Sequence, residues 1–425
     1  MRIGTGLLLT LLMSMPLKAQ SIQDSLIEMN RKLDILTEEI EKLKLGEVAE
    51  VKYEPSRGLG PAASKVYQMK NSGVSIAGYG EIVYENYAKK LDDKSRSSKT
   101  DKVDYLRNIL YVGYKFNDWI LFNSEIEFEH ATTGEGAEEK GEASVEFGYI
   151  DLMFSRKFNI RAGLILSPVG IINEKHEPTT FFGTLRPQIE RSVIPTTWRA
   201  NGVGFYGELI PSLNYRFYLM EGLNADGFEG KDGVREGRQG GSNAVAEKLA
   251  LSGKIEYEFL NGPMIGTSFY SGKSGQTTRD ASGPLDVKTN IFSVHGEYAW
   301  KGLEARALFA QTTIGNTDSL SALNGETIGK KLNGWYVVAG YDLIPLISKT
   351  STHYLAPFIQ YETLNTHAAV SESLTKNRAF NRSTVTAGIT YKPHPNVAFK
   401  WDFRNNANEK KTGNDQWNLA INYIF

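Results

Sequence analysis

Sixteen strand-like segments follow one another from residue 73 to residue 425 of this 425-residue chain, and they constrain its fold more than any other feature. Many of them alternate apolar and polar residues. In "FKWDFR", at 399–404, the aromatic side chains fall on one face and the charged side chains on the other. Because successive side chains of a strand point to opposite faces, this period of two indicates β-structure. The segments are predicted near 73–87, 103–116, 119–130, 142–155, 158–166, 201–210, 213–222, 248–260, 263–272, 287–300, 302–312, 332–344, 353–363, 382–392, 396–404 and 415–425.

The connections between these segments alternate in length. Eight long loops, such as 88–102, alternate with seven shorter turns, such as "ND" at 117–118. An antiparallel barrel in the outer membrane has short periplasmic turns and long extracellular loops, whereas a soluble β-sandwich gives no reason for strict alternation. The predicted fold class is therefore all-β: a sixteen-stranded antiparallel transmembrane β-barrel over 73–425. Its apolar faces would meet lipid, and its lumen would be aqueous because a ring of this size is too wide for side chains to fill.

The last nine residues, "WNLAINYIF", fit the closing strand of such a barrel. Their apolar face would turn to lipid, with Trp417 and Phe425 near opposite ends. Aromatic girdles of membrane barrels lie at these two interfaces. A terminal Phe after alternating aromatics also resembles the assembly signal of bacterial outer-membrane proteins. The predicted location is a cell outer membrane of the Gram-negative type, with lipid as one partner.

The N-terminal 72 residues contain three further predicted segments. Residues 1–19 have a positive start and a short apolar core, which indicates a secretory signal peptide rather than a buried first helix. Residues 20–46 carry an unbroken heptad seam and are predicted to form a short periplasmic coiled coil, with a single amphipathic helix as the alternative. The seam consists of Ile22, Leu26, Met29, Leu33, Leu36, Ile40 and Leu43. A parallel homotrimer is the favoured oligomer, and residues 47–72 are interpreted as a linker.

Composition and motifs argue against several function classes. Lys plus Arg (48) balance Asp plus Glu (49) and form no basic block, so nucleic acid is not an expected partner. The chain has no Cys, which excludes disulfides, thiolate metal sites and a Cys nucleophile. It has neither a G-x-S-x-G elbow to pair with His295 nor a phosphate-binding G-x-x-x-x-G-K-[ST] motif. "NEKHEP" lacks the second His of a zinc site. We therefore expect no enzyme activity, no metal and no cofactor.

The longest connection, 167–200, combines Pro, charged and aromatic residues in a way that does not suit a floppy surface loop. We expect it to fold into the lumen and narrow it, with aromatic side chains on the wall and polar ones toward solute. The candidate constriction residues are Arg186, Arg191, Arg199, Glu174, His176 and Glu177. The arginines would contact solute or form salt bridges with wall carboxylates.

Four passages resemble the phosphate-selective porin O and P family, in particular its Bacteroidetes-type relatives. They are "RAGLILSPVGIINEKHEPTTFFG", "RPQIERSVIPTTWRANGVGFYGEL", "GVSIAGYGEIVYENY" and the final "NYIF". The resemblance covers roughly 73–425. It implies a sixteen-stranded trimeric outer-membrane porin with an inward-folded constriction loop.

Charged residues of both signs are predicted on the lumen wall, where acidic ones outnumber basic ones nine to five. The basic residues are Arg161, Arg216, Arg306, Lys400 and Arg404; the acidic ones are Glu81, Glu85, Glu125, Glu127, Glu129, Glu256, Glu258, Glu304 and Asp402. Because the sign of a charged ring sets pore selectivity, the phosphate selectivity of the family does not carry over to this wall. The loop arginines could still create a local positive constriction.

The expected function is passive diffusion of small hydrophilic or ionic solutes through a water-filled channel, with anions such as phosphate among the candidates. The alternative is a structural outer-membrane protein whose coiled coil tethers or organises the envelope.

Overall fold

The computed structural model describes residues 29–30, 32–33, 55–132, 141–260 and 262–425. The chain divides into two compact units, Met1–Lys52 and Tyr53–Phe425. In the first unit, the four described residues are helical, and the side chains of Met29 and Leu33 are exposed. The predicted signal peptide, nearly all of the predicted coiled coil, and residues 47–54 of the predicted linker lie outside the described residues.

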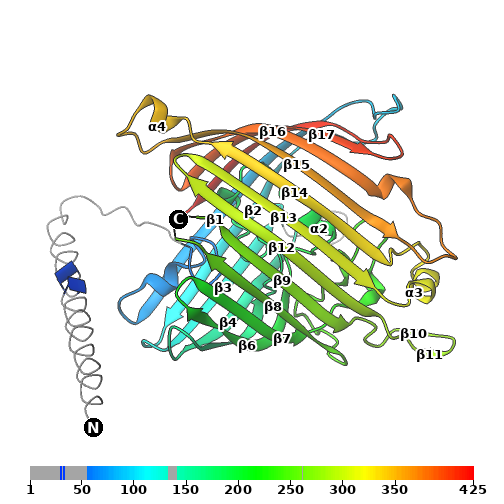
Figure 1. The fold of residues 1–425 in the computed structure, drawn as a ribbon, viewed down its shortest axis with the longest axis horizontal. Coiled ribbons are helices and arrows are strands. Elements are labelled where there is room, and N and C mark those ends of the chain that lie inside the picture. The colour runs from blue at the N-terminus through cyan, green and yellow to red at the C-terminus, as the bar shows by residue number, and fades with distance from the viewer. Residues whose placement is uncertain (1–28, 31, 34–54, 133–140, 261) are drawn as a thin grey trace, which may run out of the picture. The chain divides into compact units, whose positions relative to one another are not determined.

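The second unit contains a closed barrel of sixteen antiparallel strands, in which the first and last strands pair with each other (Figure 1). The sixteen-stranded barrel predicted from the sequence is thus confirmed. Its strands are β1 (Gly73–Tyr87), β2 (Lys102–Lys115), β3 (Ile120–Glu129), β4 (Ala143–Met153), β5 (Asn159–Leu166), β6 (Arg199–Ile210), β7 (Leu213–Glu221), β8 (Leu249–Glu258), β9 (Met264–Lys273), β12 (Lys288–Trp300), β13 (Leu303–Ile314), β14 (Lys331–Tyr341), β15 (Tyr354–Ala369), β16 (Asn381–His394), β17 (Val397–Asn408) and β18 (Gln416–Ile424).

The period of two along each strand decides which side chains face outward. On β17, Trp401 is 44% exposed and the neighbouring Lys400 only 3%. The apolar faces therefore form the outer surface and the polar faces line the inside, as expected for a barrel in lipid. On β4, a register shift opposite Glu125 and Ile126 turns both Glu146 and Phe147 inward. After the bulge, alternation continues with Phe147 and Tyr149 facing inward and Ile150 facing outward.

The connections place short turns at one end of the barrel and long loops at the other (Figure 1). The short-turn end carries α4 (Ile344–Ile347), and the long-loop end carries α3 (Thr317–Asn324) and the two-stranded β10–β11 sheet (Arg279–Asp280 and Gly283–Pro284). Strands β15 and β17 run several residues further into the long-loop end than predicted. No helix among the described residues is long and apolar enough to cross a membrane.

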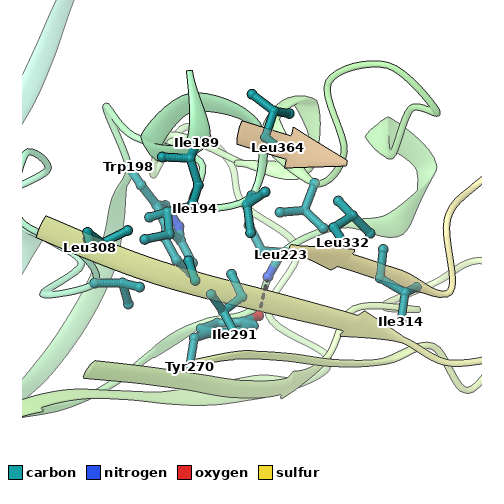
Figure 2. Close-up of a cluster of buried hydrophobic side chains, with 14 of the residues drawn as sticks. Ile189, Ile194, Trp198, Leu223, Tyr270, Ile291, Leu308, Ile314, Leu332 and Leu364 are labelled. Carbon is teal, nitrogen blue, oxygen red and sulfur yellow. Dashed lines mark hydrogen bonds between the residues drawn. The ribbon is translucent and has the colours of Figure 1, made fainter. Parts of the chain in front are cut away.

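Two of the long loops pack inside the barrel rather than above it. The first, 167–198, contains η3 (Pro178–Thr180) and α2 (Ile189–Ser192); the second, 222–248, contains η4 (Ala225–Gly227) and η5 (Arg235–Gly237). Their apolar side chains join wall residues in one buried cluster. Figure 2 shows Trp198 and Leu223 from the two loops near Tyr270 of β9, whose hydroxyl accepts a 2.8 Å hydrogen bond from the backbone N–H of Leu223. The inward packing of the second loop was not predicted.

Residues 55–72 do not behave as the linker that their composition suggested. They include η1 (Lys65–Gln68), and Leu59, Ala62, Ala63 and Val66 are almost completely buried. These side chains belong to a second buried cluster, which also contains inward-facing aromatic residues of β1, β2, β4 and β7. We call residues 55–69 the N-terminal segment. It occupies part of the lumen that a simple diffusion channel would leave open.

Candidate pore and its two cavities

The long loop 167–198, which we call the constriction loop, is held across the lumen by charged wall residues. Lys400 on β17 donates hydrogen bonds to the carbonyls of Pro178, Phe181 and Gly183 at 2.5, 2.6 and 2.9 Å. Asp402 on the same strand accepts two hydrogen bonds from Thr184.

Other strands hold the same loop. Glu362 on β15 accepts a 2.7 Å hydrogen bond from the backbone N–H of Gln188. On β9, the Ser268 hydroxyl accepts a 3.0 Å hydrogen bond from the N–H of Gly170. These strands lie on different sides of the barrel, so the loop spans the lumen and is fixed at both sides.

Three titratable side chains of the constriction loop, Glu174, His176 and Glu177, are buried in contacts with the wall and the N-terminal segment. Glu174 pairs with Lys254 at 2.7 Å and Arg216 at 3.0 Å. His176 contacts Glu125 at 3.0 Å; although burial lowers the pKa of His176, this carboxylate raises it overall above its usual value.

The third of these side chains, Glu177, accepts hydrogen bonds from the backbone N–H groups of Ala62 and Ala63 at 3.1 and 2.9 Å. Burial raises the pKa of Glu177 to about 7. The carboxylate therefore joins the constriction loop to the N-terminal segment.

A cavity of about 660 Å³ lies at the long-loop end and is lined by more cationic than anionic side chains. Nine basic residues line it: Lys99, Lys102, Arg107, Arg186, Arg191, Lys231, Arg235, Arg382 and Arg404. Four acidic residues line it: Glu81, Glu85, Asp104 and Asp232. The difference is a formal excess of five positive charges. Because low-dielectric walls focus a field of one sign, this cavity, which we call the basic vestibule, would attract anions.

The cations of the basic vestibule crowd one another. Burial, together with the nearby Arg238 and Arg191, lowers the pKa of Arg235 to about 9. The Nε atoms of Arg186, Arg382 and Arg404 are buried without a hydrogen-bond partner among the described residues. Some cations are neutralised: Arg191 contacts Asp232 at 2.9 Å, and Arg404 contacts Glu362 at 3.2 Å. Arg107 and Lys102 are paired as well, with Glu81 at 3.0 Å and Glu85 at 2.9 Å. The Nε groups of Arg186 and Arg382 keep donor capacity that an oxyanion could satisfy.

A second cavity, of about 800 Å³, lies at the short-turn end. Its charged lining is nearly balanced, with five basic residues (Arg57, Lys115, Arg156, Lys175 and Arg216) and four acidic ones (Asp118, Glu208, Glu256 and Glu258). The two cavities share no lining residue. The constriction loop and the N-terminal segment fill the lumen between them.

The structure distributes the predicted constriction residues unevenly. Arg186 and Arg191 line the basic vestibule, whereas Glu174, His176 and Glu177 line neither of the two cavities. Arg199 also lines neither, because it forms an ion pair with Glu146 on the wall. Those four side chains hold the loop and the N-terminal segment in place.

The predicted wall residues also divide into lining residues and structural ones. Arg216, Glu256 and Glu258 line the short-turn cavity, and Arg404, Glu81 and Glu85 line the basic vestibule. The others pair with neighbours. Arg161 contacts Asp151 at 2.8 Å, Arg306 contacts Glu297 at 2.9 Å, Glu125 contacts His176, Glu127 contacts Arg107 at 3.1 Å, and Lys400 holds the constriction loop.

Sequence reasoning missed several cations of the basic vestibule. Strand alternation could have found Arg107, which shares a face with the inward Ile109 and Tyr111, and Arg382, which shares one with Thr384. Lys231 and Arg235 lie in the second inward loop, and no period marks them. Counting only strand residues produced an acidic excess, because the loops supply much of the positive charge.

Comparison with solved structures shows the class of this fold. OmpF of Salmonella typhi, solved with daunomycin, has a TM-score of 0.54 at 15% identity and covers 83% of this chain and 98% of its own. The outer membrane channel DcaP of Acinetobacter baumannii has a TM-score of 0.54 at 12% identity and covers 83% of this chain and 97% of its own. The anion-selective porin of Comamonas acidovorans has a TM-score of 0.52 at 12% identity and covers 84% of this chain and 100% of its own. The chain therefore has the sixteen-stranded barrel fold of outer-membrane porins.

Sequence comparison then places the chain more narrowly. It is 38% identical over 395 residues to an uncharacterized protein of Aquifex aeolicus (strain VF5), covering 90% of this chain and 87% of that protein. The chain belongs to the same family as this Aquifex aeolicus protein. No family model matches the chain, so its resemblance to the phosphate-selective porin O and P family is not confirmed.

Proposed function

We propose that this protein is an outer-membrane diffusion channel for small hydrophilic solutes and that it favours anions, with phosphate among the candidates. The observation that carries the proposal is the basic vestibule, where nine cationic side chains face four anionic ones. A local excess of one charge at the entrance raises the concentration of the opposite ion and sets selectivity by its sign.

The position of the vestibule supports the proposed preference for anions. It lies at the long-loop end, which faces outward in barrels with short periplasmic turns. A solute from outside would meet the vestibule before it reached the constriction loop. Two of the loop's own arginines, Arg186 and Arg191, line this cavity. The entrance charge is therefore part of the loop that narrows the lumen.

The test compares uptake of an anionic sugar acid and a neutral sugar of similar size into liposomes that contain the protein. We expect the anion to enter faster. The variant Lys102→Glu/Lys231→Glu should lower the ratio of the anion rate to the neutral rate. It changes the lining of the vestibule from nine basic and four acidic residues to seven basic and six acidic residues. Both side chains are exposed, and the change at Lys102 also removes its 2.9 Å ion pair with Glu85.

A matched control is Lys301→Glu/Lys349→Glu, which changes the net charge equally at exposed residues that line neither cavity. This control should leave the ratio unchanged. Faster uptake of the neutral sugar by the wild-type protein, or an equal effect of both variants, would contradict anion preference. The predicted homotrimer stays a prediction, and conductance steps in multiples of three would support it.

A further inference from the structure

The N-terminal segment is docked on the constriction loop and the barrel wall by hydrogen bonds to both. Besides the two hydrogen bonds to Glu177, the carbonyl of Ala63 accepts a 2.9 Å hydrogen bond from the side chain of Asn123 on β3. The hydroxyl of Tyr67 donates a 2.5 Å hydrogen bond to Asp151 on β4. The segment is thus joined to one side of the wall and to the loop at once.

Small residues allow this segment to approach the loop closely. An added Cβ at Gly58 would lie 2.8 Å from the Glu174 carboxylate, and one at Gly60 would lie 2.6 Å from the Glu177 carboxyl group. Few large apolar side chains accompany them: Leu59 and Val66 are the large aliphatic residues buried here. The docking therefore depends on close fit and hydrogen bonds more than on a large apolar area.

The wall beneath the segment is unusually polar for a permanently buried surface. Tyr79, Tyr111 and Tyr218 face inward and are almost completely buried, and their hydroxyl groups have no hydrogen-bond partner among the described residues. A buried hydroxyl without a partner is unfavourable, whereas water would satisfy it. Tyr79 also packs against His176, so the constriction loop and the N-terminal segment cover this part of the wall together.

The two halves of the lumen are filled by different parts of the chain. Apolar residues of both inward loops pack with residues of β6 to β9 and β12 to β15. Leu59, Ala62 and Ala63 of the N-terminal segment pack with residues of β1, β2, β4, β5, β7 and β18, so only β7 contributes to both clusters. The N-terminal segment also lines the short-turn cavity. Its departure would leave the second half of the lumen without the residues that now fill it.

We propose that residues 55–69 form a releasable plug, latched by Glu177, and that its release opens a water path along the tyrosine-lined half of the lumen between the two cavities. This inference rests on the proposed channel function, because it describes how that channel is closed. The plug keeps the short-turn end shut while Glu177 holds the Ala62 and Ala63 N–H groups.

The absence of cysteine from the sequence permits a clean test with the full-length double variant Gly60→Cys/Glu177→Cys. A Cβ at Gly60 lies 3.1 Å from the Cγ of Glu177, the position that a cysteine sulfur would occupy, so a disulfide is geometrically feasible. Oxidation should lock the plug. Reduction should release it, because the latch carboxylate is also gone. We expect current in planar bilayers to rise about tenfold or more on reduction, because the two hydrogen bonds that Glu177 accepts from the plug are lost.

Each single cysteine variant, treated with the same oxidant and reductant, controls for effects of the reagents. Its current should be the same in the oxidant and in the reductant. A second variant, Gly60→Ala, needs no disulfide: its added Cβ would displace the plug and raise the current. Its matched control is Gly183→Ala in the constriction loop, where the nearest atoms to an added Cβ are 3.4 Å away, an ordinary contact. Gly183→Ala should conduct like the wild type.

The outcomes separate the two proposals. Equal, measurable current in the locked and reduced forms, with Gly60→Ala also at the wild-type level, would overturn the plug and leave the channel intact. Absence of current in every folded variant, reduced or oxidised, would overturn the channel function and the plug with it.

Discussion

Replacing Lys400 by Met should release part of the constriction loop while leaving the barrel closed. The Lys400 ammonium group is buried and donates hydrogen bonds to three loop carbonyls, and it also lies 4.3 Å from the ring centre of Phe181. Met has a similar length but no donor. A buried polar group left without a partner costs about 1–3 kcal/mol. Part of that cost is offset because a charge is no longer buried, so we expect loop opening to become easier by about 3 kcal/mol.

Hydrogen–deuterium exchange of peptides spanning 178–188 measures this opening. The reporters are the N–H groups of Thr184 and Gln188, which are bonded to wall carboxylates. At about 1.4 kcal/mol per tenfold change, their exchange should accelerate by roughly a hundredfold. The matched control is Lys392→Met, which removes a single hydrogen bond to the Thr179 carbonyl and should accelerate exchange by about fivefold or less. Equal exchange in Lys400→Met and the wild type would refute the idea that Lys400 anchors the loop.

Two further predictions concern buried charges. Asp151→Asn should destabilise the folded protein by about 3–5 kcal/mol in denaturant unfolding, because it leaves the buried Arg161 without its carboxylate partner; an unchanged unfolding midpoint would contradict this. The latch should also respond to pH. Burial raises the pKa of Glu177 from 4.5 to about 7. The contribution of this group to the docked state is therefore fully present below about pH 4.5 and is lost as the pH rises through about 7. The total loss of stabilising free energy is about 3 kcal/mol. Channel current should therefore be higher at pH 8 than at pH 6, and Glu177→Gln should remove this difference. His176, which pairs with Glu125, titrates nearby, and a pH response that persists in Glu177→Gln would assign the effect to that pair instead.

The barrel could be predicted from the sequence because its two signals are local. Side-chain alternation fixes which face of a strand meets lipid, and the alternation of loop lengths fixes the up-and-down order. Strand bounds agreed to within a few residues except where β15 and β17 extend past the predicted ends, in the long-loop region where no lipid constrains the sequence.

The interior could be predicted only in part, because its packing joins residues far apart in the chain. The composition of 167–200 indicated an inward loop, but nothing local showed that Glu177 would bind the backbone of Ala62 and Ala63, more than a hundred positions away. The small residues around Gly58 and Gly60 read as a linker, although in the structure they permit close approach to two carboxylates. The same composition fits both roles, so only tertiary contacts distinguish them.

The charge of the pore entrance could not be predicted from the wall residues alone, for a related reason. Counting wall residues gave an acidic excess, but Glu125, Glu127 and Asp402 are engaged with the loop or with neighbouring cations. The residues that line the basic vestibule come from both loops and strands. The tethering role suggested for the coiled coil stays a prediction.

The most direct test of anion preference is the reversal potential of the wild-type protein in a planar bilayer separating two KCl concentrations. The basic vestibule predicts a potential of the sign produced when chloride crosses more readily than potassium, and a smaller value at high salt, where charges are screened. A potential of the opposite sign, carried by potassium, would contradict the account.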